Sequence, residues 1–350
     1  MTMTTSAPGP EQQSPPRKRR TGRYVLVGAG VLVVLATLAA TIFLWTLYSS
    51  FDTRSHKLQD VFPDESGRPT QAVSPDGSSA MNVLIVGSDS RGATKDEAES
   101  GEASDQRSDT MMLVHVPADR RKMYAVSIMR DLWVPIPGHG NAKINAALAY
   151  GGVPLMVQTV EGFLNQRIDH VVFIDFDGFK GLTDAVGGVD VDVPVAFTPS
   201  WSGGSNITFP EGPMHMDGEA AFWFVHERYA FPDGDFQRTR NQQLYFQALT
   251  RKILSQEVLT NPFTVSKLVA DFSPYLSVDA QLTPGAIASI AVELRDVRPG
   301  DLVTFTLPTN GTGWSDDGQS IVAPDQDAVN ALSKAMTDGT MAQYPLGTGH

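Results

Sequence analysis

MNVLIVGSDSRG (residues 81–92) and, after an acidic run, RSDTMMLVHVPADRRKMYAVSIMRD (residues 107–131) are the part of the chain that decides the fold. Three apolar runs lie within it: Met81–Val86, Thr110–Val116 and Met123–Ile128. Each run has the length and composition of a buried strand. We therefore expect three strands that lie side by side in one sheet.

Charged residues stand directly beside each apolar run. They are Asp89 and Arg91, Arg107 and Asp109, and Arg130 and Asp131. If the three strands are neighbours, these charges collect at one edge of the sheet, which is where an open α/β sheet binds its ligand. Carboxylates and guanidinium groups together suit a divalent cation and a phosphate-rich substrate.

Composition excludes several classes of protein. The 350 residues, 41% of them hydrophobic, can bury a core in one large domain or two small ones. Residues 1–23 hold five basic residues against Glu11, a net charge of +4, so the net charge of −12 leaves −16 for residues 24–350. A body this acidic is poorly suited to nucleic acid. The absence of cysteine excludes disulfides and thiolate metal sites but decides nothing about the compartment.

The N-terminal region has the pattern of a membrane anchor. Residues 1–23 are rich in Ser, Thr, Pro and Gln before the basic cluster, and we expect a disordered cytoplasmic tail. Tyr24–Tyr48 is uncharged and, as a helix, spans about 37 Å, enough to cross a membrane once. The basic cluster places the N-terminus inside and the main part of the chain outside the cell membrane. A cleaved signal peptide is the alternative, but the apolar run is long for one and no small-residue cleavage site follows closely.

The rest of the chain divides by composition. Residues 49–80 are predicted to be an extracytoplasmic linker, residues 81–338 the catalytic domain, and residues 339–350 a flexible tail. The acidic stretch 93–106 has almost no large apolar residue and is predicted to be a surface loop, either a solvated insertion or a mobile lid.

Helices and strands alternate beyond residue 131. Predicted helices are 142–150, 154–165, 176–186, 218–228, 233–254, two within 261–292, and 325–336; predicted strands are 171–175, 189–193 and 302–307. This alternation predicts an α/β fold, a mixed central sheet flanked by helices on both faces. In helix 233–254, Asp235 lies at or near the N-cap, and Arg238 and Gln242 share one face.

Asp89 and Asp109 are the candidate metal ligands, because two carboxylates with waters and substrate phosphates commonly hold Mg²⁺. The alternative is that each caps a turn at the end of a strand. The cationic candidates for phosphate binding are Arg107, Lys122, Arg130, Arg228, Arg238 and Arg240. Taken alone, each of these is more often a surface residue or a salt-bridge partner.

Six fragments of the chain resemble one known family. They are GSDSRG, RSDTMMLVHV, SIMRD, KINAA, DFDGF (residues 175–179) and DGDFQRTRNQQ. Their order and separations are those of the LytR–CpsA–Psr family of membrane-anchored cell-wall glycopolymer ligases. The resemblance covers roughly residues 80–250, and the single N-terminal anchor also fits it.

The resemblance implies a phosphotransferase on the outer face of a bacterial membrane. It would move a phosphosugar-linked glycopolymer from a polyprenyl-pyrophosphate carrier onto a hydroxyl of peptidoglycan. By motif, Asp89 and Asp109 look like the ligands of Mg²⁺ (or Mn²⁺), and we favour Asp89 as the base that accepts the hydroxyl proton. The pyrophosphate would be bound by Arg107, Lys122, Arg130, Arg228, Arg238, Arg240 and Gln242, with Arg130 also catalytic. Apolar faces behind the site would enclose the lipid tail.

The chain departs from the family pattern at two positions. His226 replaces the first arginine of the usual Arg-x-Arg, and Asn241 stands where an arginine commonly precedes the glutamine pair. Arg240 lies one residue earlier, an offset of about 100° on a helix, which puts its role as a replacement in doubt. A protonated His226 is one possible compensation.

Three functions remain open from the sequence. The first is a ligase that transfers a glycopolymer to peptidoglycan. The second is a pyrophosphatase that acts on lipid-linked intermediates with water as the acceptor. The third is a non-catalytic receptor that binds lipid or wall glycan. The replacement of two family arginines by His226 and Asn241 is an argument for the receptor hypothesis. A transcription regulator is disfavoured, because the body is acidic and has no helix-turn-helix pattern.

Overall fold

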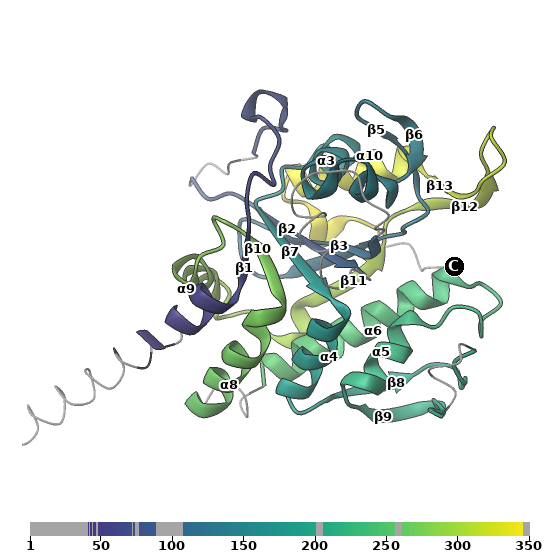
Figure 1. Cartoon of the computed structure of the whole chain (residues 1–350). Coiled ribbons are helices and arrows are strands. Elements are labelled where there is room, and N and C mark those ends of the chain that lie inside the picture. Colours follow the sequence, from purple (N-terminus) through teal and green to yellow (C-terminus); the bar gives the residue numbers. More distant parts are fainter. Residues whose placement is uncertain are drawn as a thin grey trace, which may run out of the picture. The chain divides into compact units, whose positions relative to one another are not determined.

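The computed structural model describes residues 48–71, 73, 77–88, 108–200, 206–255 and 261–345, together with residues 41, 43, 45 and 46 (Figure 1). The chain divides into two units between Thr46 and Leu47, and the fold below is that of the described residues of the second unit. The predicted cytoplasmic tail, most of the predicted span Tyr24–Tyr48 and the acidic loop 93–106 lie outside the described residues. In the part of the chain that is described, no helix is long and apolar enough to span a membrane.

A mixed sheet of seven strands forms the centre of this unit (Figure 1). In spatial order the strands are β1 (His56–Leu58), β10 (Leu276–Asp279), β7 (His170–Asp175), β2 (Met81–Ser88), β3 (Ser108–Val116), β4 (Met123–Ile128) and β11 (Leu302–Thr306). The pairs β1/β10, β7/β2 and β4/β11 are parallel, and the other three pairs are antiparallel. The prediction that the three strands of residues 81–128 are neighbours is confirmed.

Helices cover both faces of the sheet, as predicted. Leu84 and Val86 of β2 belong to a core with α3 (Ala146–Leu164) and α10 (Gln326–Thr337). The alternate β2 residues Val83 and Ile85 pack on the other face, in a cluster that includes Phe246 of α6 (Asp235–Ile253) and Ile290 of α9 (Pro284–Glu293). Burial on both faces explains why the strands read as continuous apolar runs.

A second core lies between three helices and a small sheet. It joins α4 (Phe176–Ala185), α5 (Gly218–His226) and α6 with β8 (Val189–Val193) and β9 (Gly212–Met216). Two further two-stranded sheets are β5 (Trp133–Ile136) with β6 (Gly140–Lys143), and β12 (Thr309–Trp314) with β13 (Ser320–Pro324). The helix α8 (Pro262–Phe272) precedes β10.

Several sequence expectations were wrong in detail. The strand predicted at 189–193 exists, but it pairs with β9 and not with the central sheet. Residues 140–143 form β6 and not the start of a helix, and the segment 261–292 contains the strand β10 as well as two helices. The two helices predicted around residues 142–165 do meet at the predicted break, because Gly151 and Gly152 have non-helical dihedral angles and Gly152 has a φ of 62°.

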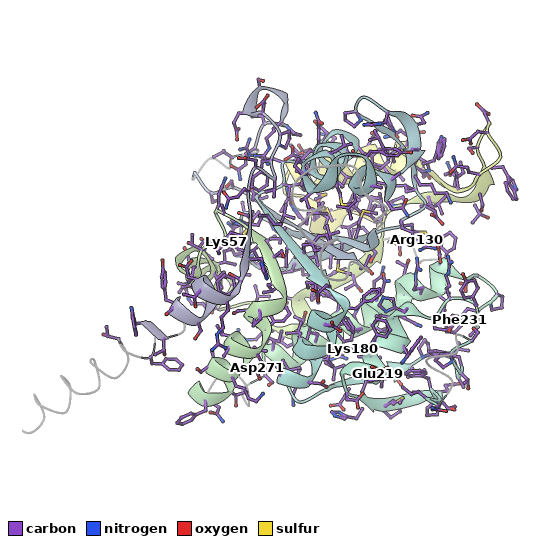
Figure 2. The ribbon with its side chains drawn as sticks, in the orientation of Figure 1. Lys57, Arg130, Lys180, Glu219, Phe231 and Asp271 are labelled. Carbon is purple, nitrogen blue, oxygen red and sulfur yellow. The ribbon has the colours of Figure 1, made fainter. Side chains whose placement is uncertain are left out.

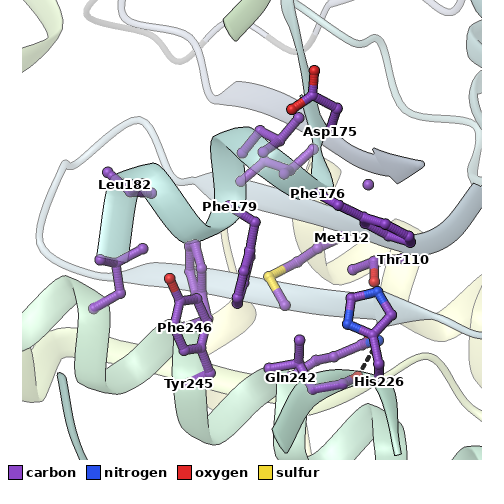
Figure 3. Close-up of a pocket in the computed structure, with 15 residues that line it drawn as sticks. Thr110, Met112, Asp175, Phe176, Phe179, Leu182, His226, Gln242, Tyr245 and Phe246 are labelled. Atoms are coloured by element: carbon purple, nitrogen blue, oxygen red, sulfur yellow. Dashed lines mark hydrogen bonds between the residues drawn. The ribbon is translucent and has the colours of Figure 1, made fainter. Parts of the chain in front are cut away.

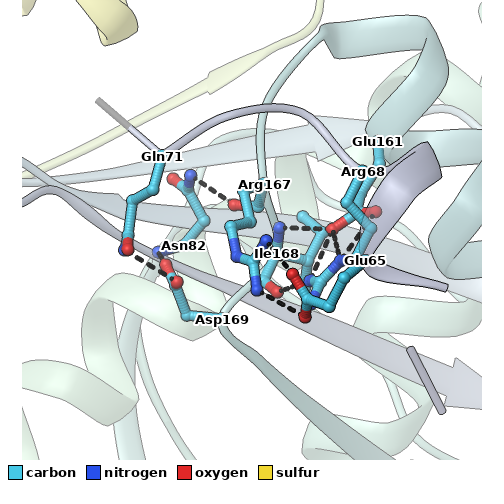
Figure 4. Close-up of polar contacts among 8 residues, drawn as sticks. All are labelled: Glu65, Arg68, Gln71, Asn82, Glu161, Arg167, Ile168 and Asp169. Carbon is cyan, nitrogen blue, oxygen red and sulfur yellow. Dashed lines mark hydrogen bonds and ion pairs between the residues drawn. The ribbon is translucent and has the colours of Figure 1, made fainter. Parts of the chain in front are cut away.

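The stretch 49–80 was predicted to be a linker, yet it contributes to the domain. Its strand β1 pairs with β10 at the edge of the central sheet. Arg68, with a side chain only 3% exposed, forms an ion pair of 2.7 Å with Glu161 of α3 (Figure 4). Nearby, the Asp169 carboxylate accepts the backbone N–H of Asn82 at 2.7 Å. The domain therefore begins before residue 81.

The end of the chain is also more ordered than predicted. Residues 339–350 were expected to be a flexible tail, but Met341 is 1% exposed and lies in the core beside α10. The Tyr344 hydroxyl donates a hydrogen bond of 3.2 Å to the carbonyl of Ala328. The remainder of this tail, residues 346–350, is outside the described residues.

Candidate functional site

Four strand ends meet at one edge of the central sheet. β2 ends at Ser88, whose Cα partners are Ser108 at the start of β3 and Asp175 at the end of β7. Met111 of β3 pairs with Ile128 at the end of β4, two residues before Arg130. The register therefore gathers the segments that carry most of the predicted site, as the sequence predicted.

Three arginines from distant parts of the chain converge on one carboxylate at this edge. Asp235, the first residue of α6, lies 3.4 Å from Arg130 and 3.3 Å from both Arg228 and Arg238. The Asp235 side chain is 18% exposed and that of Arg238 is 7% exposed. Burial acts to raise the pKa of Asp235, but the attraction of Arg238, Arg130 and Arg228 outweighs it and holds this pKa below its usual value.

A second ion pair borders the arginine cluster. Lys143 of β6 lies 3.3 Å from Asp131, which is itself 4.0 Å from Arg130. Together these six described side chains carry four positive and two negative charges, a net charge of +2. A local positive charge in an otherwise acidic body attracts an anionic ligand to this edge.

An apolar pocket opens beside the charged edge, between one face of the sheet and the helices α4, α5 and α6 (Figure 3). Its volume is about 120 Å³. The lining includes Ile85, Thr110, Met112, Phe176, Phe179, His226, Gln242 and Phe246. Apart from a few polar groups near the charged edge, it presents hydrocarbon and aromatic surface, which suits an apolar chain.

One stripe of α6 connects the charges to the pocket. Asp235 and Arg238 belong to the ion cluster, whereas Gln242, Phe246 and Leu249 line the pocket. These positions are three or four residues apart, so they lie on one face of the helix. The Gln242 side chain donates a hydrogen bond of 3.3 Å to the carbonyl of Val225, the residue before His226. A ligand with an anionic head and an apolar tail would lie along this stripe.

The two departures from the family pattern, His226 and Asn241, lie in different surroundings in the structure. His226 lines the pocket, with its Nδ1 2.8 Å from the Phe222 carbonyl and its ring 4.6 Å from that of Phe176. Asn241 is fully buried and faces α5, where its Nδ2 donates to the Phe224 carbonyl at 3.1 Å. Asn241 therefore joins two helices and does not contact the pocket.

Two residues predicted to bind pyrophosphate lie away from this site. Lys122 precedes β4, at the opposite end of that strand from Arg130, because β4 runs from Met123 to Ile128. Arg240 forms an ion pair with Asp233 and a hydrogen bond with Gln237 on another face of α6. Lys122 and Arg240 therefore do not join the arginine cluster around Asp235, because Lys122 precedes β4 while Arg130 follows it, and Arg240 faces away from Arg238 on α6.

The structure brings Arg130, Arg228 and Arg238 together around Asp235, and Gln242 follows Arg238 along α6. Asp89 and Arg107 are outside the described residues.

The candidate metal ligands are only partly described. Asp109 lies in β3 and its side chain is not described, and Asp89 follows Ser88 in the sequence. Among the described side chains, no group of three His, Asp or Glu residues could hold a metal ion. Because Ser88 pairs with Ser108, the backbone positions next to the two candidate ligands are neighbours, which fits a shared cation.

Sequence reasoning noticed Asp235 only as a helix cap. The N-cap is in fact Gly234, and Asp235 instead collects the three arginines. A usable signal was present in the sequence, since Asp235, Arg238 and Gln242 share one helix face. Asp175 was also overlooked: it lines the pocket and caps α4 by accepting the N–H of Gly178 at 2.7 Å.

Fold and site together define a mixed α/β domain in which an arginine cluster and an apolar pocket lie next to each other along α6. The model of the LytR_cpsA_psr family matches residues 46–338, and the chain belongs to this family. The match begins well before residue 81, in agreement with the place of β1 and Arg68 in the fold.

Curated relatives and solved structures agree with this assignment. The chain is 32% identical over 289 residues to the cell wall biosynthesis protein LcpA of Corynebacterium glutamicum, which covers 72% of this chain and 55% of LcpA. It is 32% identical over 238 residues to TagU of Bacillus anthracis, a polyisoprenyl-teichoic acid–peptidoglycan teichoic acid transferase, covering 68% of this chain and 72% of TagU. The crystal structure of Bacillus subtilis TagV superposes with a TM-score of 0.62 at 27% identity, over 75% of this chain and 97% of TagV. The chain thus spans about half the length of LcpA.

Proposed function

We propose that this protein is a membrane-anchored phosphotransferase that moves a glycopolymer from a polyprenyl-pyrophosphate carrier onto peptidoglycan, outside the cell membrane. The observation that carries the proposal is a cluster of three arginines next to an apolar pocket: Arg238 lies one helical turn before Gln242, which lines the pocket, and pairs with the same carboxylate as Arg130 and Arg228. A polyprenyl pyrophosphate has the matching shape, an apolar chain attached to a dianionic or trianionic head. The name of TagU, a transferase that acts on polyisoprenyl-linked teichoic acid and peptidoglycan, supports the same reaction class.

The arginines serve the reaction through their charge. The leaving polyprenyl phosphate gains negative charge as the phosphoryl bond breaks, and fixed guanidinium groups stabilise that charge more in the transition state than in the ground state. Asp235 keeps the three guanidinium groups in place before the donor binds, so less reorganisation is needed during the reaction. Arg238, with a side chain only 7% exposed, acts in a largely dry environment in which its charge is weakly screened.

Asp89 and Asp109 would hold Mg²⁺ or Mn²⁺, which supplies further neutralisation of the pyrophosphate when bound. Asp89 also remains our candidate for the base that accepts the proton of the incoming hydroxyl. The apolar residues of α4, α6 and the sheet exclude water from the prenyl chain and orient the pyrophosphate toward the arginines.

The proposal is tested with the full chain in detergent, a polyprenyl-pyrophosphate-linked sugar as donor and peptidoglycan glycan strands as acceptor, with Mg²⁺ present. Transfer of the labelled phosphosugar to the glycan is the expected result. Arg130→Ala should lower kcat/KM by about 100-fold or more, the range for removing a group that stabilises transition-state charge. Lys122→Ala, an exposed lysine at the other end of β4, is the matched control and should retain full activity.

Other outcomes would decide against a ligase. Phosphate release that does not depend on the glycan, as the only activity, would establish a pyrophosphatase. Normal wall assembly supported by folded Arg130→Ala and Asp109→Ala variants would favour a binding protein without catalysis. Removal of divalent ions with a chelator should abolish transfer, and unchanged transfer after chelation would remove the metal from the proposal.

A further inference from the structure

The hairpin of β12 and β13 carries an exposed tryptophan next to the candidate site. Trp314 is 76% exposed, which is unusual for so large an apolar side chain. The hairpin is joined to the site by its own backbone, since the N–H of Val322 donates a hydrogen bond of 2.9 Å to the carbonyl of Asp131. Asp131 directly follows Arg130, which Figure 2 labels beside this hairpin.

The strand register gives the distance along the hairpin. Trp314 pairs with Ser320, two residues from Val322, so it lies roughly 7 Å along β13 from the contact with Asp131. The exposed ring therefore belongs to the strand that pairs with β13, and β13 contacts Asp131, the residue next to Arg130.

One face of β12 has the composition of a carbohydrate-binding surface. Exposure alternates along this strand, and Asn310, Thr312 and Trp314 are the exposed positions. An aromatic ring packs against the apolar face of a pyranose ring, and amide and hydroxyl groups bond to sugar hydroxyls. The alternation places Thr312 and Trp314 on the same side of the hairpin, whereas Asn310 lies where the register shifts and donates its side-chain N–H to the Pro324 carbonyl at 3.2 Å.

The tip of the hairpin is ordered by its own hydrogen bonds. The N–H of Ser315 donates to the Gln319 carbonyl and the N–H of Gly318 donates to the Ser315 carbonyl, both at 2.9 Å. The Gln319 side chain donates to Asp317 at 2.7 Å. Trp314 is therefore presented on a pre-formed turn, and binding loses little conformational entropy there.

Charge distinguishes between the possible partners. Asp316 and Asp317 stand exposed at the tip, and these two carboxylates repel an anionic membrane surface and a phosphate-rich glycopolymer. Neutral pyranose units are not repelled. Of the two glycans in the proposed reaction, the acceptor is therefore the better partner for this surface.

We infer that the β12–β13 hairpin is the docking surface for the acceptor glycan, with Trp314 stacked on a pyranose ring and the acceptor hydroxyl directed to the edge that holds Arg130. This inference rests on the proposed function, because it takes the acceptor from that reaction. It assigns Trp314 as a positioning residue for the acceptor and gives it no part in the chemistry.

The test measures glycan binding to the full chain in detergent by calorimetry, without donor, using chitotetraose and soluble peptidoglycan glycan strands as probes. Trp314→Ala should weaken binding by tenfold or more, and Trp314→Tyr should remain within about threefold of the unmodified protein. Phe263→Ala is the matched control, since Phe263 is 87% exposed on α8, and it should bind as the unmodified protein does. Equal binding by Trp314→Ala and the unmodified protein, or no binding by either, would overturn the inference.

Two further readouts separate this inference from the proposed function. In transfer assays Trp314→Ala should raise the KM for the glycan tenfold while donor KM and kcat stay within twofold. Absence of transfer by every variant, with glycan binding that still depends on Trp314, would refute the ligase and leave the docking surface intact. Loss of binding to anionic lipid vesicles in Trp314→Ala, with glycan binding unchanged, would instead make the hairpin a lipid-contacting element and overturn the inference.

Discussion

Replacing Asp235 by asparagine separates two roles that this residue could have. The change removes one negative charge and keeps the size of the side chain. In the structure Asp235 pairs with Arg130, Arg228 and Arg238 at 3.3–3.4 Å, and these arginine side chains are 7–29% exposed. Because the contacts are partly screened, each contributes about 1 kcal/mol, so Asp235→Asn should lower the free energy of unfolding by about 3 kcal/mol.

The stability loss should depend on pH in a defined direction. The pKa of Asp235 in the folded protein lies below its ordinary value of 3.8, so its contribution is fully present above that value and is lost as the pH falls through the folded-state pKa. The difference in stability between the two proteins should thus be constant above about pH 5 and shrink below pH 4. Urea unfolding at a series of pH values measures it.

Although Asp235→Asn should destabilise the fold, it should strengthen binding of the anionic donor. Without the carboxylate, the net charge of the described cluster rises from +2 to +3. One charge roughly 8 Å from a phosphate, at an effective dielectric constant of about 40, contributes about 1 kcal/mol, so donor KM should fall about fivefold. The loss of orientation in the arginines should lower kcat by less than tenfold.

Asp233→Asn is the control for Asp235→Asn, because Asp233 forms a more exposed ion pair, with Arg240, just before the same helix. It should change stability by less than about 0.5 kcal/mol and leave both kinetic constants unchanged. Unaltered stability in Asp235→Asn would mean that the arginine cluster does not form as described. A loss of kcat above 1,000-fold in a folded Asp235→Asn variant would place this carboxylate in the chemistry and refute our assignment.

Three more predictions concern the fold and the pocket. Arg68→Met should lower the free energy of unfolding by about 3–5 kcal/mol, measured in urea, because it leaves Glu161 buried and charged without its partner. A loss below about 1 kcal/mol would mean that residues 65–71 are a linker that does not stabilise the domain. Gly218→Ala should cost about 1–3 kcal/mol, since a Cβ there would lie 2.4 Å from the Lys180 carbonyl oxygen, and an unchanged melting temperature would contradict that close approach. Ile85→Trp, which fills the pocket, should raise the KM for a long polyprenyl donor at least tenfold and leave binding of inorganic pyrophosphate unchanged, whereas an equal effect on both would argue that the lipid lies elsewhere.

Much of the sheet was predictable because strand patterns are local. The apolar runs of residues 81–128 identify β2, β3 and β4, and strands that follow one another in sequence are usually neighbours in the sheet, as these three are. The strand β10 and the place of β1 were not predictable from local patterns, since β1 pairs with β10, which follows it by more than 200 residues, and β10 pairs with β7, which precedes it by about 100 residues. Short strands of three or four residues carry too little pattern to be recognised.

The sequence by itself determined which charged residues flank the strands and which face of α6 bears Asp235, Arg238 and Gln242, because both follow from the period of a single element. Only the tertiary structure decided which of these charges meet. The antiparallel pairing of β3 and β4 brings Arg130, just after the end of β4, to the edge of the sheet where β3 begins, and long-range packing brings Arg130 to Asp235, about 100 residues later. Ion pairs between distant segments depend on strand direction, register and helix docking, and these are properties of the whole core.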